Sequence, residues 1–95
     1  PWLEEAATLA PDNARMHYVW AVALRDTGRL PEAIAVLEAA HARRPADADV
    51  LYALALYHLD AGDKAAAARH ARELSRLQPD NAQARALLER LGNTP

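Results

Sequence analysis

The chain has 95 residues, of which 52% are hydrophobic and 25% are charged, and its formal net charge is −2. This balance excludes a strongly basic surface for a nucleic-acid backbone. Alanine and leucine occupy 38 positions, whereas phenylalanine is absent and β-branched residues are few. Because alanine and leucine favour helices and β-branched and aromatic residues favour strands, the composition predicts an all-α fold.

The absence of cysteine excludes disulfides, thiolate zinc sites and iron–sulfur ligation within this sequence. It leaves the compartment undecided between cytoplasm and periplasm. No apolar run approaches the length of a membrane-spanning helix, which is about 18 residues or more. The chain opens with Pro1 rather than methionine and has no leader pattern, so we expect a segment of a longer protein.

Several residue types recur with a spacing of 34 residues, which is the main organising feature of the sequence. A repeat of this length is typical of a helical hairpin that stacks on its neighbours. The recurring residues are Pro11, Pro45 and Pro79; Asn13, Asp47 and Asn81; Gly28 and Gly62; Ala21 and Ala55; and Ala33 and Ala67.

The first elements along the chain are predicted as follows. Residues 1–10 match the second helix of a truncated repeat. Asn13 is an N-cap residue for a helix over 14–27, which ends at Gly28. A second helix over 30–43 follows, and Pro45 prevents its continuation.

The remaining elements repeat this order. Capping residues Asp47 and Asp63 begin helices over 48–61 and 64–77, with Gly62 between the two helices. Pro79 then ends the unit, and Asn81 caps a last helix over 82–91.

The pattern resembles the tetratricopeptide repeat, whose signature alternates large and small residues at fixed positions before a proline. The resemblance implies an α-solenoid of antiparallel helical hairpins, with repeats over 14–45 and 48–79 and a capping helix over 82–91. The matching residues in the first unit are His17, Trp20, Ala21, Leu24, Ala33, Leu37, Ala40 and Pro45, and those in the second are Leu51, Leu54, Ala55, His58, Ala67, Ala71, Leu74 and Pro79.

Small residues should allow the two helices of each hairpin to approach closely. We expect Ala21 to face Ala33 and Ala55 to face Ala67. Ala71 and Leu74 depart from the usual pattern, because the large and small residues are exchanged. The space between hairpins is expected to be filled by Trp20, Leu24, Ile34, Leu37, Leu51 and Leu54.

The resemblance also implies that the first helix of each hairpin lines a concave groove, where partners of such proteins bind. The expected function is a noncatalytic scaffold that binds an apolar or amphipathic peptide or helix. The alternative is an accessory docking domain of a larger enzyme, with its groove packed intramolecularly. The predicted groove residues are Arg15, Tyr18, Val22, Arg25, Asp49, Tyr52, Leu56 and Leu59.

No catalytic site, cofactor or metal site is predicted. Ser75 is the single serine and has no histidine at helical spacing. His58 and His70 approach each other across their hairpin, but His41 belongs to the other repeat, so no third metal ligand is expected with them. The basic stripe of Arg69, Arg72 and Arg76 includes Glu73 and is interpreted as a solvated face.

Self-association is a further expectation. The apolar residues Trp2, Leu3 and Leu9 would lack the cover of a preceding helix. Exposed apolar patches promote association, so this truncated face would join two copies of the chain at high concentration.

Overall fold

A computed structural model describes residues 14–92, and in this part of the chain helices are joined by short turns, with no strand. The elements confirm the predicted all-α class, and each boundary lies within one residue of the prediction. The helix expected in residues 1–10, the apolar face within it and the Asn13 cap lie outside the described residues. The helices are α2 (Ala14–Asp26), α3 (Leu30–Arg43), α4 (Ala48–Asp60), α5 (Lys64–Leu77) and α6 (Ala82–Arg90).

Side-chain caps begin three of these helices, as predicted. Asp47 Oδ1 accepts a hydrogen bond from the Val50 amide at 3.2 Å, and Asp63 Oδ1 accepts one from the Ala66 amide at 3.0 Å. Asn81 does the same for α6, accepting from the amide three residues later at 3.0 Å. Each cap satisfies an amide that has no partner within its own helix.

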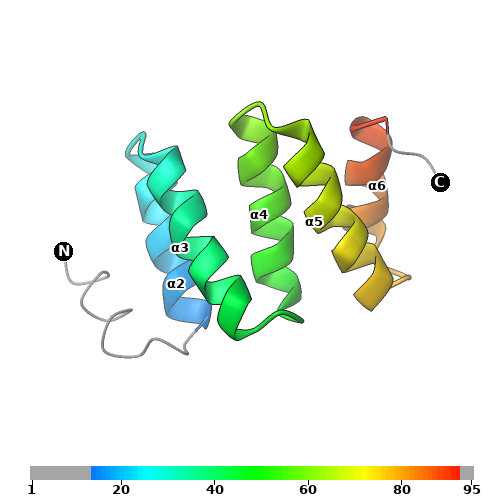
Figure 1. Ribbon diagram of the computed structural model, residues 1–95, viewed down its shortest axis with the longest axis horizontal. Helices are drawn as coiled ribbons and strands as arrows, with labels where there is room; N and C mark the ends of the chain where they lie inside the picture. The colour runs from blue at the N-terminus through cyan, green and yellow to red at the C-terminus, as the bar shows by residue number, and fades with distance from the viewer. Residues whose placement is uncertain (1–13, 93–95) are drawn as a thin grey trace.

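The turn within each of the two hairpins uses glycine for its backbone freedom. Gly28 and Gly62 have φ values of +81° and +85°, a left-handed conformation that other residues adopt only with strain. These turns reverse the chain between α2 and α3 and between α4 and α5, so each pair of helices forms an antiparallel hairpin (Figure 1).

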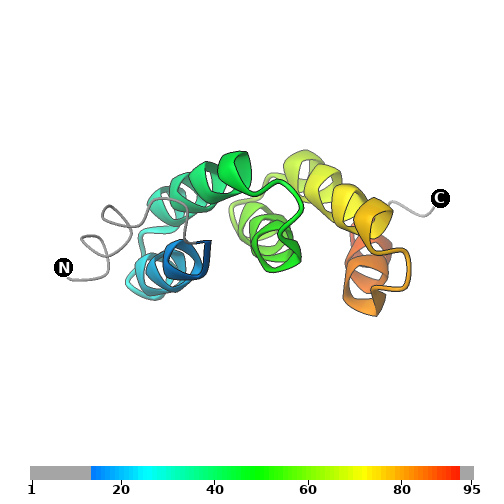
Figure 2. The ribbon, with the colours of Figure 1, turned by 90° about the horizontal axis from the view of Figure 1, so that it is seen from below.

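The hairpins stack into two layers. Helix α3 packs on α4, and α5 packs on α6, so each hairpin contacts the element that follows it. Viewed from below, α2, α4 and α6 lie in one layer and α3 and α5 lie in the other (Figure 2). The layer of α2, α4 and α6 lies on the inner side of a shallow arch. This arrangement places the first helix of every unit on one face.

Alanine pairs occupy the centres of the hairpins. Ala21 and Ala33 are fully buried and belong to one core cluster that joins α2 and α3. Ala55 and Ala67 are also fully buried in the second hairpin, where Ala55 shares a cluster with Ala71. Because all four alanines are fully buried, we expect a larger side chain at any of these positions to disturb the packing of its hairpin.

The six apolar residues expected between hairpins divide over two interfaces. Leu24, Leu37 and Leu54 are buried in the first core cluster, and Trp20 and Ile34 are partly buried against it. Leu51 is fully buried in a different cluster, which joins α4 to α5 and α6. Each interface therefore has its own core, as nearest-neighbour stacking requires.

The exchange of large and small residues in the second unit is compensated across its interface. In the first interface, Ala40 of α3 packs in the same cluster as Val50 of α4. At the equivalent places 34 residues later, Leu74 of α5 packs with Ala84 of α6. The larger residue has moved from one side of the contact to the other, so the interface remains filled.

Helix α6 packs back on the second hairpin. Leu87 and Leu88 are buried in a cluster with Ala55 and Ala71, and Leu91 is partly buried against it. Arg85 and Glu89 are exposed on the outward side, and no ion pair joins them within residues 14–92. Among the helices that the structure describes, none has both the length and the apolar character needed to cross a bilayer.

Candidate functional site

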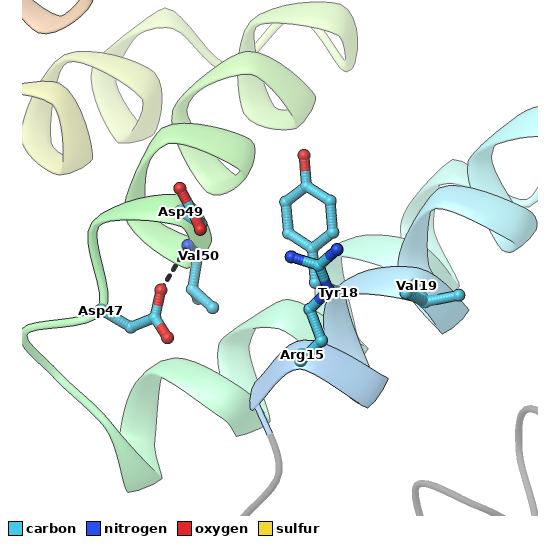
Figure 3. A pocket seen from close by; sticks show the side chains of 6 residues that line it. All are labelled: Arg15, Tyr18, Val19, Asp47, Asp49 and Val50. Atoms are coloured by element: carbon cyan, nitrogen blue, oxygen red, sulfur yellow. Dashed lines mark hydrogen bonds between the residues drawn. The ribbon is translucent and has the colours of Figure 1, made fainter.

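A pocket of about 300 Å³ opens between α2 and the beginning of α4 (Figure 3). Helix α2 contributes the side chains of Arg15, Tyr18 and Val19. The other wall is formed by Asp47, the N-cap residue of α4, together with Asp49 and Val50. The pocket therefore lies between the first helices of two adjacent units.

Three of the predicted groove residues meet in this pocket, namely Arg15, Tyr18 and Asp49. Arg15 and Asp49 are exposed, and Tyr18 is partly buried against the first core cluster. The pocket thus combines an aromatic ring with one positive and one negative charge.

The sequence prediction missed the other three lining residues. Val50 is 1% exposed and forms the floor, whereas Val19 is 37% exposed and points away from the α4 residues (Figure 3). The Asp47 carboxylate lines the pocket while it caps α4. The sequence predicted Asp47 as a capping residue. It could not predict that Asp47 also lines a pocket, because that depends on how α2 packs beside α4.

The remaining apolar groove residues are not in the pocket, and all four are partly buried. Tyr52 and Leu59 pack against a third cluster, which is formed by Ala55, Ala71, Leu87 and Leu88. Leu56 contacts both that cluster and the first core cluster. These three side chains pack against the core with one part of their surface and leave the other part accessible. Val22 is also partly buried.

Arg25, another predicted groove residue, already makes contacts within the chain. Its Nη2 donates a hydrogen bond to Asp60 Oδ2 at 2.7 Å, and its guanidinium lies 4.9 Å from the centre of the Tyr57 ring. Burial raises the pKa of the Tyr57 phenol, and the Arg25 charge opposes that rise. Arg25 therefore joins α2 to α4. Because the Arg25–Asp60 ion pair is exposed, it contributes little to the stability of the fold.

The basic stripe on α5 is exposed at Arg69, Arg72 and Arg76, as expected for a solvated face. Glu73 lies among these residues. Its carboxylate accepts two hydrogen bonds from the Arg76 guanidinium, the shorter at 2.5 Å. This pairing neutralises part of the stripe, and it lies on the opposite layer from the pocket.

A second polar cluster was not anticipated. The expectation that no third metal ligand lies with His58 and His70 is wrong, because Glu38 of α3 joins them. Glu38 Oε1 lies 3.5 Å from His58 Nε2 and 3.4 Å from His70 Nε2. The His41 ring packs edge-on against His70, with 5.8 Å between ring centres. Burial lowers the pKa of His70 and so favours its neutral form.

The comparison with known families agrees with this architecture. A family model described as the tetratricopeptide repeat matches residues 24–91, which is well over half of the chain. The chain belongs to the tetratricopeptide repeat family. Tetratricopeptide repeats generally mediate protein–protein interaction, and the family is typically a noncatalytic scaffold. A search of curated proteins returned no match for this tetratricopeptide repeat chain.

Proposed function

We propose that this chain is a noncatalytic binding module whose groove between α2 and α4 holds an apolar or amphipathic peptide or helix. The observation that supports the proposal most directly is the pocket between these helices, in which Arg15, Tyr18 and Asp49 converge. The helices that carry these residues belong to the layer on the inner side of the arch, where an elongated ligand could contact more than one unit (Figure 2).

The pocket offers both affinity and orientation. An apolar side chain of the ligand would lie against the Tyr18 ring and the Val50 floor, displacing water from apolar surface. The affinity of such a contact comes mainly from this buried area. Tyrosine suits the role because it presents a broad apolar ring and has few rotatable bonds to restrict.

The charges around the pocket would set the direction of the ligand. Arg15 is exposed and can pair with an acidic group, and Asp49 on the opposite wall can pair with a basic one. Arg25 is less suited to this role, because it already bonds to Asp60. A ligand with an apolar residue between an acidic and a basic residue would therefore fit one orientation better than the reverse.

The half-buried residues Tyr52, Leu56 and Leu59 extend the apolar surface along α4 towards α6. This extension favours a ligand with several apolar residues on one side, which is the pattern of an amphipathic helix. Ser75, the single serine of the chain, lies on α5 in the other layer, away from the pocket. The proposed activity is therefore recognition, with no reaction at the groove.

The proposal can be tested by selecting short peptides that bind the 95-residue chain from a random display library, then mapping the bound peptide by amide chemical shifts. We expect the largest shifts on α2 and α4 around Tyr18 and Asp49. An Arg15→Ser variant should bind the selected peptide about 3- to 10-fold more weakly, because a partly exposed charge contact is lost. The matched control is Arg69→Ser on the outer layer, which should leave affinity unchanged.

The proposal would be contradicted by shifts that map to α3 and α5, or by equal losses of affinity in the Arg15 and Arg69 variants. Either result would place binding on the outer layer or make it a general effect of positive charge.

A further inference from the structure

Three acceptor atoms converge on one point where α3, α4 and α5 meet. Glu38 comes from α3, His58 from α4 and His70 from α5. One ligand atom from each residue lies within 4.8 Å of the other two. The imidazoles are stacked nearly parallel, with ring centres 5.3 Å apart and an angle of 12° between their planes.

The hydrogen bonding of His70 determines which of its nitrogens faces this point. His70 Nδ1 lies 2.9 Å from the carbonyl oxygen of Ala66, which can only accept a hydrogen bond, so Nδ1 carries the proton and donates it. In the neutral ring, Nε2 is then unprotonated and directs its lone pair at Glu38 Oε1, 3.4 Å away. In histidines that bind metals, the ring nitrogen that does not contact the metal commonly donates to a carbonyl, which fixes the tautomer in this way.

The Nε2 atom of His58 is a second ring nitrogen near Glu38 Oε1. It is buried and has no hydrogen-bond partner among the described residues, and it lies 3.5 Å from Glu38 Oε1. Lone pairs from a carboxylate and from an imidazole repel each other unless a positive charge lies between them.

The spacing fits a small cation. In a tetrahedral zinc site with bonds of about 2.0–2.1 Å, neighbouring ligand atoms are about 3.3–3.4 Å apart. The two contacts of Glu38, at 3.5 and 3.4 Å, already have this spacing. The ligand atoms lie within 4.8 Å of one another, so completing three corners of the tetrahedron requires rotations that unstack the two imidazoles and bring their nitrogens to about 3.4 Å.

We propose that Glu38, His58 and His70 bind a Zn²⁺ ion, with the fourth position taken by water. The donor set of two imidazoles and one carboxylate is one that zinc accepts in proteins. The Glu38 side chain is 47% exposed, whereas those of His58 and His70 are 15% and 7% exposed, so an ion can enter from the Glu38 side.

The ion would act as a cross-link between repeats. Glu38 belongs to the first hairpin, and both histidines belong to the second. Because stacked repeats depend on their neighbours for stability, a ligand that holds adjacent hairpins together stabilises the folded array. This site shares no residue with the pocket between α2 and α4, and the proposal does not depend on the peptide groove.

The test is to titrate ZnCl₂ into the tag-free chain after chelator treatment, by calorimetry and by thermal unfolding. We expect one Zn²⁺ per chain with a dissociation constant in the micromolar range or below, and a higher midpoint of unfolding when zinc is present. Mg²⁺, which prefers oxygen ligands, should give neither effect.

Variants at two positions keep the test specific. Because the Glu38 side chain is half-exposed, the Glu38→Gln variant should retain the fold, which circular dichroism would check. The variant should bind zinc at least about tenfold more weakly and lose the thermal shift. The matched control is Glu32→Gln, an exposed residue of the same helix that pairs with Arg29. It should bind zinc like the unaltered chain.

Histidine ring resonances provide an independent readout. Added Zn²⁺ should shift the ring signals of His58 and His70 and leave those of His17 unchanged. The proposal is overturned if no saturable binding of one ion is seen, if Glu38→Gln binds as tightly as Glu32→Gln, or if zinc shifts His17 instead.

Discussion

The compensated packing between α5 and α6 predicts a measurable coupling between Leu74 and Ala84. Leu74 is 1% exposed and Ala84 is fully buried, and both belong to the cluster that joins these helices. Leu74→Ala removes three carbon atoms, which costs about 2.4 kcal/mol in lost burial at about 0.8 kcal/mol for each. The cavity that remains raises the total to about 3–4 kcal/mol.

The reverse change tests the same contact from the other side. Ala84→Val alone adds two carbon atoms to a filled space and should cost about 1–3 kcal/mol through overpacking. In the double variant, the added valine atoms can occupy the space that Leu74→Ala vacates. This recreates the arrangement of Ala40 and Val50 in the first interface. We therefore expect the double variant to be at least about 1.5 kcal/mol more stable than the sum of the two single changes.

Urea unfolding followed by far-ultraviolet circular dichroism provides the three free energies of unfolding. A chain of 95 residues has a total stability of about 5–14 kcal/mol, so the single losses should be measurable. A coupling below about 0.5 kcal/mol would mean that the two changes act independently, and it would refute the argument that size has been exchanged across this interface.

Two further predictions concern the hairpins and their caps. Ala67→Leu should destabilise the chain by about 1–3 kcal/mol through overpacking, whereas Ala35→Leu on the exposed side of α3 should be nearly neutral; equal effects in thermal unfolding would contradict the packing assignment. Asp63→Ala should cost about 1 kcal/mol in urea unfolding, because the Ala66 amide loses its acceptor, and the exposed Asp80→Ala is the control; indistinguishable losses would show that the cap adds nothing.

The fold could be predicted almost completely from the sequence, because its determinants are local. The spacing of 34 residues, the caps such as Asp47 and the glycines at the turns each act within a few residues of their own position. Burial of Ala21 and Ala33 also followed from the repeat register, since equivalent positions of stacked hairpins have equivalent neighbours.

The contacts between units could be predicted less well. Arg25 and Asp60 are 35 residues apart, and their ion pair depends on how far α2 and α4 are offset. The meeting of Glu38 with His58 and His70 likewise requires three helices from two hairpins at particular crossing angles. No local spacing in the sequence encodes such a meeting, because Glu38 comes from the hairpin that precedes the one carrying both histidines.

The groove could be predicted from the sequence only in part. The repeat register predicted that Arg15, Tyr18 and Asp49 lie on the groove side of the first helices, and these three residues line one pocket. The repeat register could not predict that the buried Val50 forms the floor of this pocket, because that depends on how deeply α4 packs against its neighbours.

The central claim, that the inner face of α2 and α4 is the binding surface, is tested most directly by the affinity of a selected peptide for a Tyr18→Ala/Tyr52→Ala variant. Both tyrosines are partly buried at equivalent positions of the two repeats. We predict a loss of more than about 2 kcal/mol in binding free energy, measured by calorimetry, with helicity retained and a smaller fall in thermal stability than Ala67→Leu causes. Unchanged affinity per folded molecule, with a large fall in stability, would mean that the tyrosines belong to the core and that partners bind elsewhere.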